Sequence, residues 1–508
     1  MTPLADSPAN ERLLANVHPP AWSNPQPLEN YNVVVLGAGT AGLVTAIGAA
    51  GLGAKVAMVE RSLMGGDCLN VGCVPSKGVI SAARAAAAVR EAEAFGVHAS
   101  IDRIDFAAAM ERMRRLRADI SPNDSATRFQ EAGVDVFFGD AAFNADGSIA
   151  VQTGKGTTTL HGSRVVIATG ARAFTPDVPG LADINPLTNE TVFTLTEPPR
   201  RLLVLGGGPI GSELAQSFAR LGVEVVLLEQ GPGILSGDDP EGSAIVADQM
   251  RRDGVTIHLN TKLTRVEKDG DTVRCHLEGP GAPAVEEGSH LLVGVGRQPN
   301  VETLNLDAVG VKWDTRYGVE VDDSLRTANP RIWAAGDVCS RFKFTHAAEF
   351  MARTVIENAL IKSRLKLPLK KTSKLVIPHA TYTSPEIAGV GETPTAKSTP
   401  DGDCYTFSLD DNDRAILEGQ TAGFVKIWTR RGSDEIIGGT VVAEAAGELI
   451  GQITMAMTHK LGLGAIASVI QPYPTQADAI RQAANAYTKT KFTPTAATVL
   501  GKLFAWTR

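Results

Sequence analysis

One local pattern occurs twice in the 508-residue chain, and it limits what the chain can fold into. Each copy has an apolar strand, a glycine-rich turn, a helix and a second apolar strand that ends in glutamate. The first copy runs from Gly37 to Glu60 and the second from Gly206 to Glu229, so the spacing is 23 residues in both. This pattern is typical of the dinucleotide-binding βαβ unit. Two copies therefore predict two Rossmann-like domains.

The glycine turn lets a pyrophosphate approach the backbone, and the N-terminus of the following helix stabilises its negative charge. The glutamate can accept hydrogen bonds from ribose hydroxyls. Two nucleotide-free Rossmann-like folds are the alternative, and the equal spacing argues against it. The predicted nucleotide-binding residues are Gly37, Gly39, Gly42 and Glu60 in the first copy and Gly206, Gly208, Gly211 and Glu229 in the second.

A close cysteine pair, Cys68 and Cys73, lies between glycines just before an alanine-rich helical run. The other three cysteines are far apart in the sequence, which excludes a disulfide scaffold. A helix N-terminus and a nearby lysine, here Lys77, favour the reactive thiolate form, so the pair suits redox chemistry. A zinc site needs about four ligands and this segment offers two, so we predict no metal site.

The composition narrows the classes of partner and location. With 49 basic and 56 acidic residues the chain is mildly acidic, which argues against nucleic acid as a partner. No apolar run reaches the roughly 18 residues of a membrane span, and the first 30 residues do not resemble a signal peptide. We expect a cytoplasmic protein of about three domains.

Two further strands end in small residues. Residues 165–171 end in a turn where Thr169 and Gly170 would let the backbone approach a ligand, although a plain sheet strand is the alternative. Residues 332–337 end at Asp337, which could bind a ribose hydroxyl or cap the next helix.

In chain order, the first glycine turn, the cysteine segment, Thr169-Gly170, the second glycine turn and Gly336-Asp337 together resemble the class-I pyridine nucleotide-disulfide oxidoreductases. This family includes dihydrolipoyl dehydrogenases, glutathione reductases and mercuric reductases. The resemblance covers about residues 31–490 and implies an α/β fold. It implies an FAD domain (31–175 and 300–375), an NAD(P) domain (176–299) and an α+β dimerisation domain (376–490), with an N-terminal extension (1–30) and a C-terminal tail (491–508).

The resemblance also assigns roles to individual residues. The first βαβ unit would bind FAD and the second the nicotinamide nucleotide. Cys73 would face the flavin as the charge-transfer thiolate, and Cys68 would meet the substrate. Glu213 would lie near the nicotinamide, or it could simply complement the helix dipole in the first turn. The other implied cofactor contacts are Lys77, Ala141, Thr169, Gly170, Gly296 and Asp337.

The residues after Glu229 favour NADH over NADPH. A carboxylate accepts hydrogen bonds from a 2′-hydroxyl but repels a 2′-phosphate, which NADP sites usually bind with arginine. Residues 230–233 are Gln-Gly-Pro-Gly, and no arginine occurs before Arg251.

Near the C-terminus the chain departs from most of these relatives. Where they have a histidine acid/base and a glutamate, this chain has Tyr473 and Asp478. A tyrosine with a pKa near 10 is a poor base at neutral pH, so rapid dithiol exchange is disfavoured. Tyr473 and Asp413 resemble the mercuric reductases. However, the terminal cysteine pair of those enzymes is missing, because no cysteine follows Cys404.

We therefore predict a homodimeric FAD enzyme that uses NADH to reduce a Cys68–Cys73 disulfide and passes electrons to a small acceptor. The acceptor would be a metal ion such as mercuric ion, a small disulfide or a quinone. The alternatives are a dihydrolipoyl dehydrogenase, a redox- or metal-sensing flavoprotein without turnover, and a structural subunit of a complex. We expect the tail to form a helix packed on the dimer, with docking to a partner or membrane as the alternative.

Overall fold

The computed structural model describes residues 4–508, which divide into two compact units. The first unit contains the chain up to residue 206 with residues 217–226 and 263–375. The second contains residues 207–216, 227–262 and 376–508. This division runs through the predicted NAD(P) domain, and the three-domain boundaries stay a prediction.

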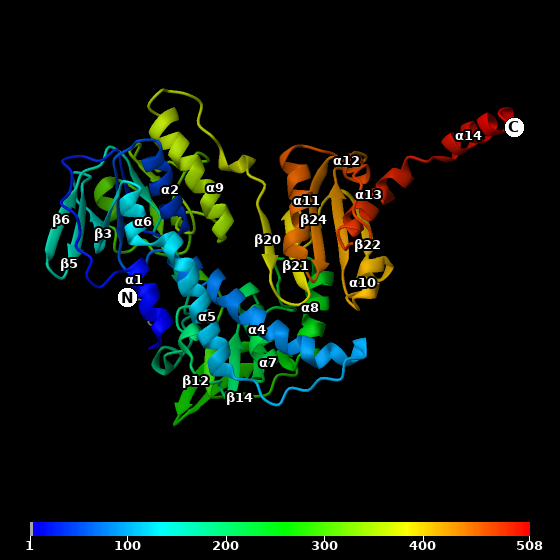
Figure 1. Cartoon of the computed structure of the whole chain (residues 1–508), viewed down its shortest axis with the longest axis horizontal. Coiled ribbons are helices and arrows are strands. Elements are labelled where there is room, and N and C mark those ends of the chain that lie inside the picture. Colours follow the sequence, from blue (N-terminus) through cyan, green and yellow to red (C-terminus); the bar gives the residue numbers. More distant parts are fainter. Residues whose placement is uncertain (1–3) are drawn as a thin grey trace. The chain divides into compact units, whose positions relative to one another are not determined.

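A five-stranded parallel sheet forms the centre of the first unit, with the order β19-β7-β1-β2-β3. Its strands are apolar and almost wholly buried, as expected for a parallel sheet covered on both faces. Helices α2 and α9 pack side by side against it (Figure 1). The bounds are β1 (Val33–Leu36), α2 (Thr40–Gly51), β2 (Val56–Glu60), β3 (Val134–Phe138), β7 (Val165–Ile167), β19 (Ile332–Ala334) and α9 (Thr345–Val355).

The first predicted βαβ unit is thus confirmed as β1-α2-β2, with Val33 opposite Val56. The second predicted unit is β9-α7-β10, in a four-stranded sheet of order β11-β10-β9-β15. In that sheet β9 and β15 are parallel, with Leu202 opposite His290. The bounds are β9 (Arg201–Leu205), α7 (Pro209–Arg220), β10 (Glu224–Leu228), α8 (Pro240–Arg252), β11 (Val255–His258) and β15 (His290–Val293).

Smaller antiparallel sheets complete the first unit. They have the orders β4-β5-β6, β12-β13-β14, β16-β8 and β17-β18, the last formed by β17 (Trp313–Asp314) and β18 (Gly318–Val319). The bounds are β4 (Asp140–Phe143), β5 (Ile149–Thr153), β6 (Gly156–Leu160), β8 (Ala171–Ala173), β12 (Lys262–Asp269), β13 (Thr272–Glu278), β14 (Val285–Gly288) and β16 (Arg297–Pro299).

The cysteine segment forms two consecutive helices, α3 (Gly66–Asn70) and α4 (Cys73–Glu91), and α5 (Phe106–Ile120) packs against both. Residues 4–30 of the N-terminal extension belong to this unit. The extension begins with α1 (Pro8–Val17), which packs on α5. Further along, the side-chain amide of Asn24 pairs with both backbone groups of Phe138, at 2.9 and 2.8 Å. The extension therefore covers the edge strand β3, whose backbone groups would otherwise be unpaired.

In the second unit, residues 376–508 form an antiparallel sheet of order β20-β21-β24-β23-β22 with helices on it. This is the α+β arrangement predicted for the dimerisation domain. The bounds are β20 (Pro378–Thr381), β21 (Glu386–Gly391), β22 (Asp403–Ser408), α10 (Asp413–Leu417), β23 (Phe424–Thr429), β24 (Ile436–Ala443), α11 (Ala446–Thr458), α12 (Leu463–Ala467), α13 (Asp478–Thr490) and α14 (Pro494–Trp506).

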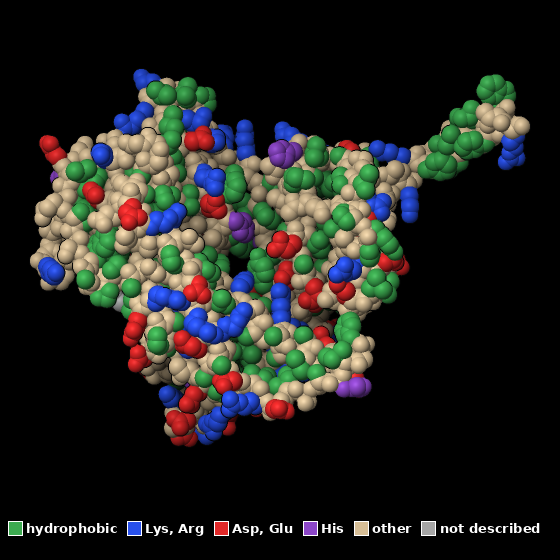
Figure 2. Space-filling view, in the orientation of Figure 1, with side chains coloured by type: hydrophobic (Ala, Val, Ile, Leu, Met, Phe, Trp, Pro, Cys, Tyr) green, Lys and Arg blue, Asp and Glu red, His purple; other side chains and the backbone are tan. Residues whose placement is uncertain are grey.

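The predicted helix in the tail is α14, and none of its side chains is buried in the single subunit. Its exposed residues include Val499, Phe504 and Trp506, which form an apolar surface (Figure 2). What covers this surface in the assembly stays a prediction. Within residues 4–508, no helix is long and apolar enough to span a membrane.

Candidate functional site

The first glycine turn leaves no space for side chains. Gly37 has a φ of +102°, and a Cβ atom there would lie 2.4 Å from the carbonyl oxygen of Ala168. A Cβ atom on Gly42 would lie 1.8 Å from the carbonyl oxygen of Gly37. Gly39 is the N-cap of α2, so the free N–H groups of this helix point out of the turn.

The side chain of Glu60, at the end of β2, is hydrogen-bonded to the backbone of this turn. Its carboxylate accepts hydrogen bonds from the backbone N–H groups of Ala38 and Ser62, both at 2.7 Å. Burial raises the pKa of Glu60, while these hydrogen bonds lower it. The carboxylate is therefore held at the turn, where a ribose would be bound.

The cysteine segment lies directly over the first turn. The N–H of Gly65 donates to the carbonyl oxygen of Ala38 at 2.8 Å. A Cβ atom on Gly66 would lie 2.6 Å from the Cα of Gly39. Two adjacent glycines thus permit the backbone of the redox segment to contact the backbone of the nucleotide turn.

Cys68 lies within α3, and Cys73 is the first residue of α4. Neither cysteine forms a disulfide in the structure, and their side chains are hydrogen-bonded to each other. Cys73 Sγ also lies 3.4 Å from Thr345 Oγ1, at the start of α9. The hydrogen bond with Cys73 and then burial raise the pKa of Cys68, and the Thr345 hydroxyl lowers it. Cys68 therefore keeps its proton at neutral pH.

A charged cluster lies beside the cysteines. Arg297 forms an ion pair with Asp67, which precedes Cys68, and its Nε is 3.8 Å from Asp337 Oδ2. Lys343 donates to the main-chain oxygen of Asp337. Burial raises the pKa of Asp337, and the two cations lower it. Asp337 does not cap α9, whose N-cap is Phe344, so the capping alternative is wrong.

Asn300 holds the turn at Thr169 and Gly170. Its side chain donates to the Thr169 carbonyl at 2.9 Å, and its N–H donates to the Gly170 carbonyl at 3.0 Å. In return, Thr169 Oγ1 donates to the carbonyl of Asn300 at 2.7 Å. Gly170 has a φ of +65°, which favours glycine at this place.

The second turn repeats the acid geometry of the first. The carboxylate of Glu229 accepts hydrogen bonds from the N–H groups of Gly207, at 2.7 Å, and Gly231, at 2.6 Å. Gly206 has a φ of +103°. Cβ atoms on Gly206 and Gly207 would lie 2.8 Å from the Gly294 carbonyl oxygen and from Ile234 Cγ2, so these positions are closed. A Cβ atom on Gly208 would have no neighbour within 4 Å among the described residues, so the turn is open at Gly208.

Glu213 is buried, and its Oε1 accepts a hydrogen bond from the N–H of Tyr382 at 2.9 Å. It lies beyond the first turn of α7, which begins at Pro209 and has no acid in its first turn. The helix-dipole alternative for Glu213 is therefore wrong. Its proximity to a nicotinamide stays a prediction.

Tyr473 is exposed in the single subunit, and its hydroxyl donates to Asp413 Oδ2 at 2.9 Å. This hydrogen bond raises the pKa of Tyr473. Asp478 instead accepts hydrogen bonds from Arg481 Nε at 2.6 Å and from Gln482 Nε2 at 3.1 Å. The partner of the tyrosine is thus Asp413, and the catalytic roles of Tyr473 and Asp478 stay predictions.

The remaining predicted residues lie near these features. The side chain of Lys77 is half-buried. Lys77 lies near the N-terminal end of α4, which begins at Cys73. Gly296, with a φ of +143°, precedes Arg297. Ala141 lies in β4 opposite Val151, and Gly211 lies in α7. Their contacts with cofactors stay predictions.

The first turn and its surroundings fit an FAD molecule. The turn has free helix N–H groups and no room for side chains, as a pyrophosphate requires. Glu60 would hold a ribose, and Asp337 and Arg297 would hold other polar groups. The Nε of Arg297 is buried without a hydrogen-bond partner among the described residues, so a polar donor remains for a ligand.

Four residues of this site were not predicted from the sequence: Thr345, Arg297, Asn300 and Asp67. Thr345 gave no signal, because it lies 272 residues from Cys73. Arg297 and Asn300 follow Gly296 in the run Gly-Arg-Gln-Pro-Asn, whose glycine and proline indicate a turn and could have pointed to them.

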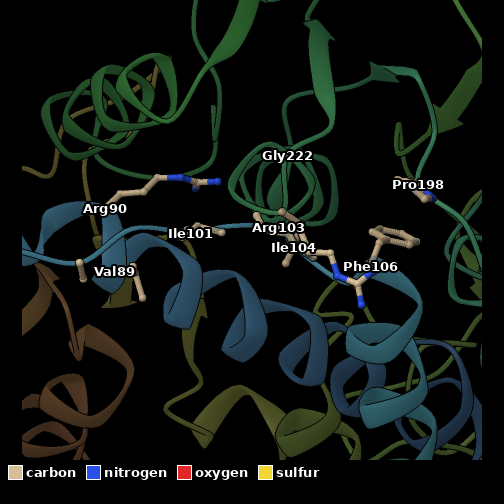
Figure 3. Close-up of a pocket in the computed structure, with 10 residues that line it drawn as sticks. Val89, Arg90, Ile101, Arg103, Ile104, Phe106, Pro198 and Gly222 are labelled. Atoms are coloured by element: carbon tan, nitrogen blue, oxygen red, sulfur yellow. The ribbon is translucent and has the colours of Figure 1, made fainter.

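A surface cavity of about 480 Å³ lies in the first unit. It is lined by residues such as Arg90, Arg103 and Phe106 on α4, α5 and the segment between them (Figure 3). None of the predicted site residues lines it. Within residues 4–508, no group of three or more His, Cys, Asp or Glu side chains is arranged to hold a metal ion.

A cysteine pair over one dinucleotide turn, with a second such turn in the same chain, is the arrangement of a flavin-linked disulfide reductase. Residues 31–352 match the pyridine nucleotide-disulphide oxidoreductase model, and residues 377–484 match the dimerisation domain of that family. The chain belongs to this family. It is an FAD-dependent enzyme that uses NAD(P)H, as predicted.

The chain is similar to relatives from two branches of the family, the mercuric reductases and the dihydrolipoyl dehydrogenases. The chain is 37% identical over 465 residues to a mercuric reductase of Streptomyces lividans, covering 90% of this chain and 96% of the relative. It is 31% identical over 462 residues to a dihydrolipoyl dehydrogenase of Bacillus subtilis, covering 90% and 96%.

Solved structures agree with this fold. LpdA from Mycobacterium tuberculosis is 26% identical with a TM-score of 0.81, over 91% of this chain and all of that chain. The Cu(II) complex of the HOCl-induced flavoprotein disulfide reductase RclA from Escherichia coli is 26% identical with a TM-score of 0.78, over 90% of this chain and all of that chain. The function is therefore disulfide or metal reduction driven by NAD(P)H.

Proposed function

We propose that the enzyme oxidises NADH and passes the electrons through Cys68 and Cys73 to a thiophilic metal ion, of which mercuric ion is the first candidate. The carrying observation is the hydrogen bond from the Tyr473 hydroxyl to Asp413. Because this bond raises the pKa of Tyr473, the hydroxyl stays protonated at neutral pH and cannot accept a proton as a general base there.

Dithiol exchange needs such a base. Cys68 keeps its proton at neutral pH, and an attacking thiol has to lose it. Reduction of a thiol-bound metal ion has no equivalent demand on a base, because soft metal ions bind thiolates and displace the thiol proton themselves. The difference favours a metal ion over a lipoyl or glutathione disulfide as the acceptor.

The chemistry that FAD supplies when bound is transfer of two electrons between a nicotinamide and a disulfide. The chain positions Cys68 and Cys73 over the FAD turn and fixes their hydrogen bonds through Thr345. The overall reaction balances as NADH and Hg²⁺ giving NAD⁺, elemental mercury and one proton. Two electrons leave the nicotinamide and two reach the metal.

NADH is the proposed donor because Glu229 lies on the turn where a 2′-phosphate would be repelled. The match to the dimerisation domain supports a homodimer. The cytoplasmic location inferred from the sequence stays part of the proposal.

The test is an acceptor panel with the flavin-loaded homodimer. NADH consumption is measured with mercuric ion in excess small thiol, cupric ion, oxidised lipoamide, glutathione disulfide and a quinone. Wild type is compared with Cys68→Ala and with the matched control Cys404→Ala, an exposed cysteine that lies on β22. We expect mercuric ion to be reduced fastest, and we expect Cys68→Ala to lower the rate of NADH consumption with mercuric ion by at least about tenfold.

Three outcomes would reject parts of the proposal. Lipoamide reduction faster than mercuric reduction would indicate a dihydrolipoyl dehydrogenase. A metal-dependent rate that Cys68→Ala retains would remove the cysteine pair from the path. No turnover with any acceptor would favour a sensor.

A further inference from the structure

The N-terminal helix α1 lies outside the matched family region, which begins at residue 31. It is nevertheless part of the hydrophobic core, because Leu13 and Val17 are fully buried. They lie in the same cluster as Met64 and Leu69 of the redox segment (residues 64–73), which includes both cysteines. The N–H of Met64 donates to the carbonyl of Val17 at 3.0 Å. The end of α1 is therefore attached directly to the segment that contains the cysteines.

Arg117 on α5 joins α1 to the same segment at a second point. It is 2% exposed, and its Nη2 donates to Asn10 Oδ1 on α1 at 2.6 Å. Its Nη1 donates to the carbonyl of Asn70 at 2.6 Å. Asn70 lies between Cys68 and Cys73 and is the last residue of α3.

The Asn70 carbonyl needs this donor. It belongs to the last turn of a helix, where carbonyl groups have no partner within the helix. The side chain of Asn70 donates to the carbonyls of Met64, at 3.0 Å, and Gly66, at 2.9 Å, so it braces the same segment from within. Arg117 therefore fixes the piece of main chain that sets the separation of the two cysteines.

Burial of the Arg117 guanidinium disfavours its charged form and so lowers its pKa. Burial, and then the charge of Arg114, lower the pKa of Arg117 to about 10. A buried charge is costly unless its hydrogen bonds are made, and the two strong bonds go to α1 and the redox segment. Asn10 is itself fixed, because its Nδ2 donates to the Ala5 carbonyl at 2.6 Å.

We propose that Arg117 is a positioning residue for the Cys68–Cys73 pair and that α1 holds it in place through Asn10. Disulfide formation needs Cβ atoms about 3.8 Å apart, so a looser segment forms the disulfide less readily. Arg117 acts on the main chain and not on the sulfur charge. This inference rests on the proposed redox role of the two cysteines.

The test uses the flavin-loaded homodimer with Arg117→Met, Asn10→Ala, the double variant and Arg117→Lys. Arg114→Met is the matched control. Arg114 is on the same helix and equally buried, but it donates to the Leu195 carbonyl at 2.6 Å. Two quantities are measured: amide hydrogen exchange of residues 66–73, and the fraction of Cys68–Cys73 disulfide in thiol–disulfide buffers, read by alkylation and mass spectrometry.

We expect Arg117→Met and Asn10→Ala to speed exchange in residues 66–73 by about tenfold and to shift the disulfide equilibrium toward the dithiol. The double variant should match Arg117→Met alone, because Asn10 acts through Arg117. Arg117→Lys should recover part of the effect. Arg114→Met should loosen residues 193–195 and leave residues 66–73 unchanged.

Unchanged exchange in residues 66–73 and an unchanged equilibrium in both single variants would overturn the proposal, as would an equal effect of Arg114→Met. If Arg117→Met does not fold, Asn10→Ala decides by the same readouts. Failure of the proposed function is distinguishable, because Cys68→Ala would then retain turnover while the exchange effect of Asn10→Ala remained.

Discussion

The two nucleotide turns have the same acid geometry but different surroundings. Glu60 and Glu229 each accept one hydrogen bond from the turn and one from the residue two positions after the acid. The first turn is covered, since Gly65 and Gly66 contact it. At the second turn, a Cβ atom on Gly208 would have free space among the described residues.

This difference matches two modes of nucleotide use. A covered turn, with a buried acid and the redox segment against it, suits a cofactor that stays bound through many turnovers. An open turn suits a nucleotide that enters and leaves in each cycle. We infer that the repeat supplies one binding geometry twice, and that the cysteine segment, which contacts the first turn, would keep the nucleotide bound there.

The largest expected effect tests the covered turn. Gly42→Ala places a Cβ atom 1.8 Å from the Gly37 carbonyl, which has to move. We expect a loss of more than about 3 kcal/mol of stability and purified protein with little bound flavin. The absorbance ratio of flavin to protein and the melting temperature measure this. The matched variant Gly208→Ala should keep its flavin and raise only the KM for NADH, and equal flavin loss in both would contradict the comparison.

The second prediction neutralises each of the two acids in turn. Glu60→Gln and Glu229→Gln each replace a charged acceptor by a neutral one, which costs about 1.5–3 kcal/mol in the interactions affected. Glu60→Gln should weaken FAD retention, measured by flavin release in denaturant. Glu229→Gln should leave FAD in place and raise the KM for NADH by about tenfold. A rise in the KM for NADH in Glu60→Gln, with FAD retained, would show that the roles are reversed.

Much of this comparison was predictable from the sequence. Both turns, both acids and the cysteine pair follow from local patterns of strand, glycine and spacing, whereas the α+β C-terminal domain was expected only from the resemblance to the family. The covering of the first turn was not predictable in this way, since it depends on Gly66 lying against Gly39 in three dimensions. Thr345 and Arg117 were also missed, because a threonine at a helix start and an arginine on an amphipathic helix have no distinguishing pattern.

The third prediction concerns the choice of donor at the open turn. Gln230→Arg adds a cation beside Glu229, where a 2′-phosphate would lie if bound. An exposed cation contributes about 1 kcal/mol, so kcat/KM for NADPH should rise by roughly fivefold while that for NADH changes little. Steady-state kinetics with both donors measure the ratio. A wild type that already prefers NADPH would reject the inference from Glu229.

The smallest expected effect concerns the reactivity of the Cys68 thiol, in the segment that contacts the covered turn. The Thr345 hydroxyl lowers the pKa of Cys68, so Thr345→Val should raise that pKa further. A thiol reacts as the thiolate, and a higher pKa leaves less thiolate at any pH below it. The Thr345 hydroxyl affects this pKa less than Cys73 and burial do, so its loss should fall near the low end of the roughly 0.5–1.5 kcal/mol for one neutral hydrogen bond and slow alkylation of Cys68 at pH 8 by roughly twofold.

The pH dependence of Cys68 alkylation shows in which direction the pKa is shifted. Because the pKa of Cys68 is already raised, its alkylation rate in reduced wild type should still be rising above pH 9, where an ordinary thiol with a pKa of about 8.5 levels off. In Thr345→Val the rise should move to still higher pH, while the KM for NADH stays constant because the open turn is untouched. A profile with its midpoint near pH 8.5 would show that Cys73 and burial do not hold the proton on Cys68, and the argument against rapid dithiol exchange would lose its support.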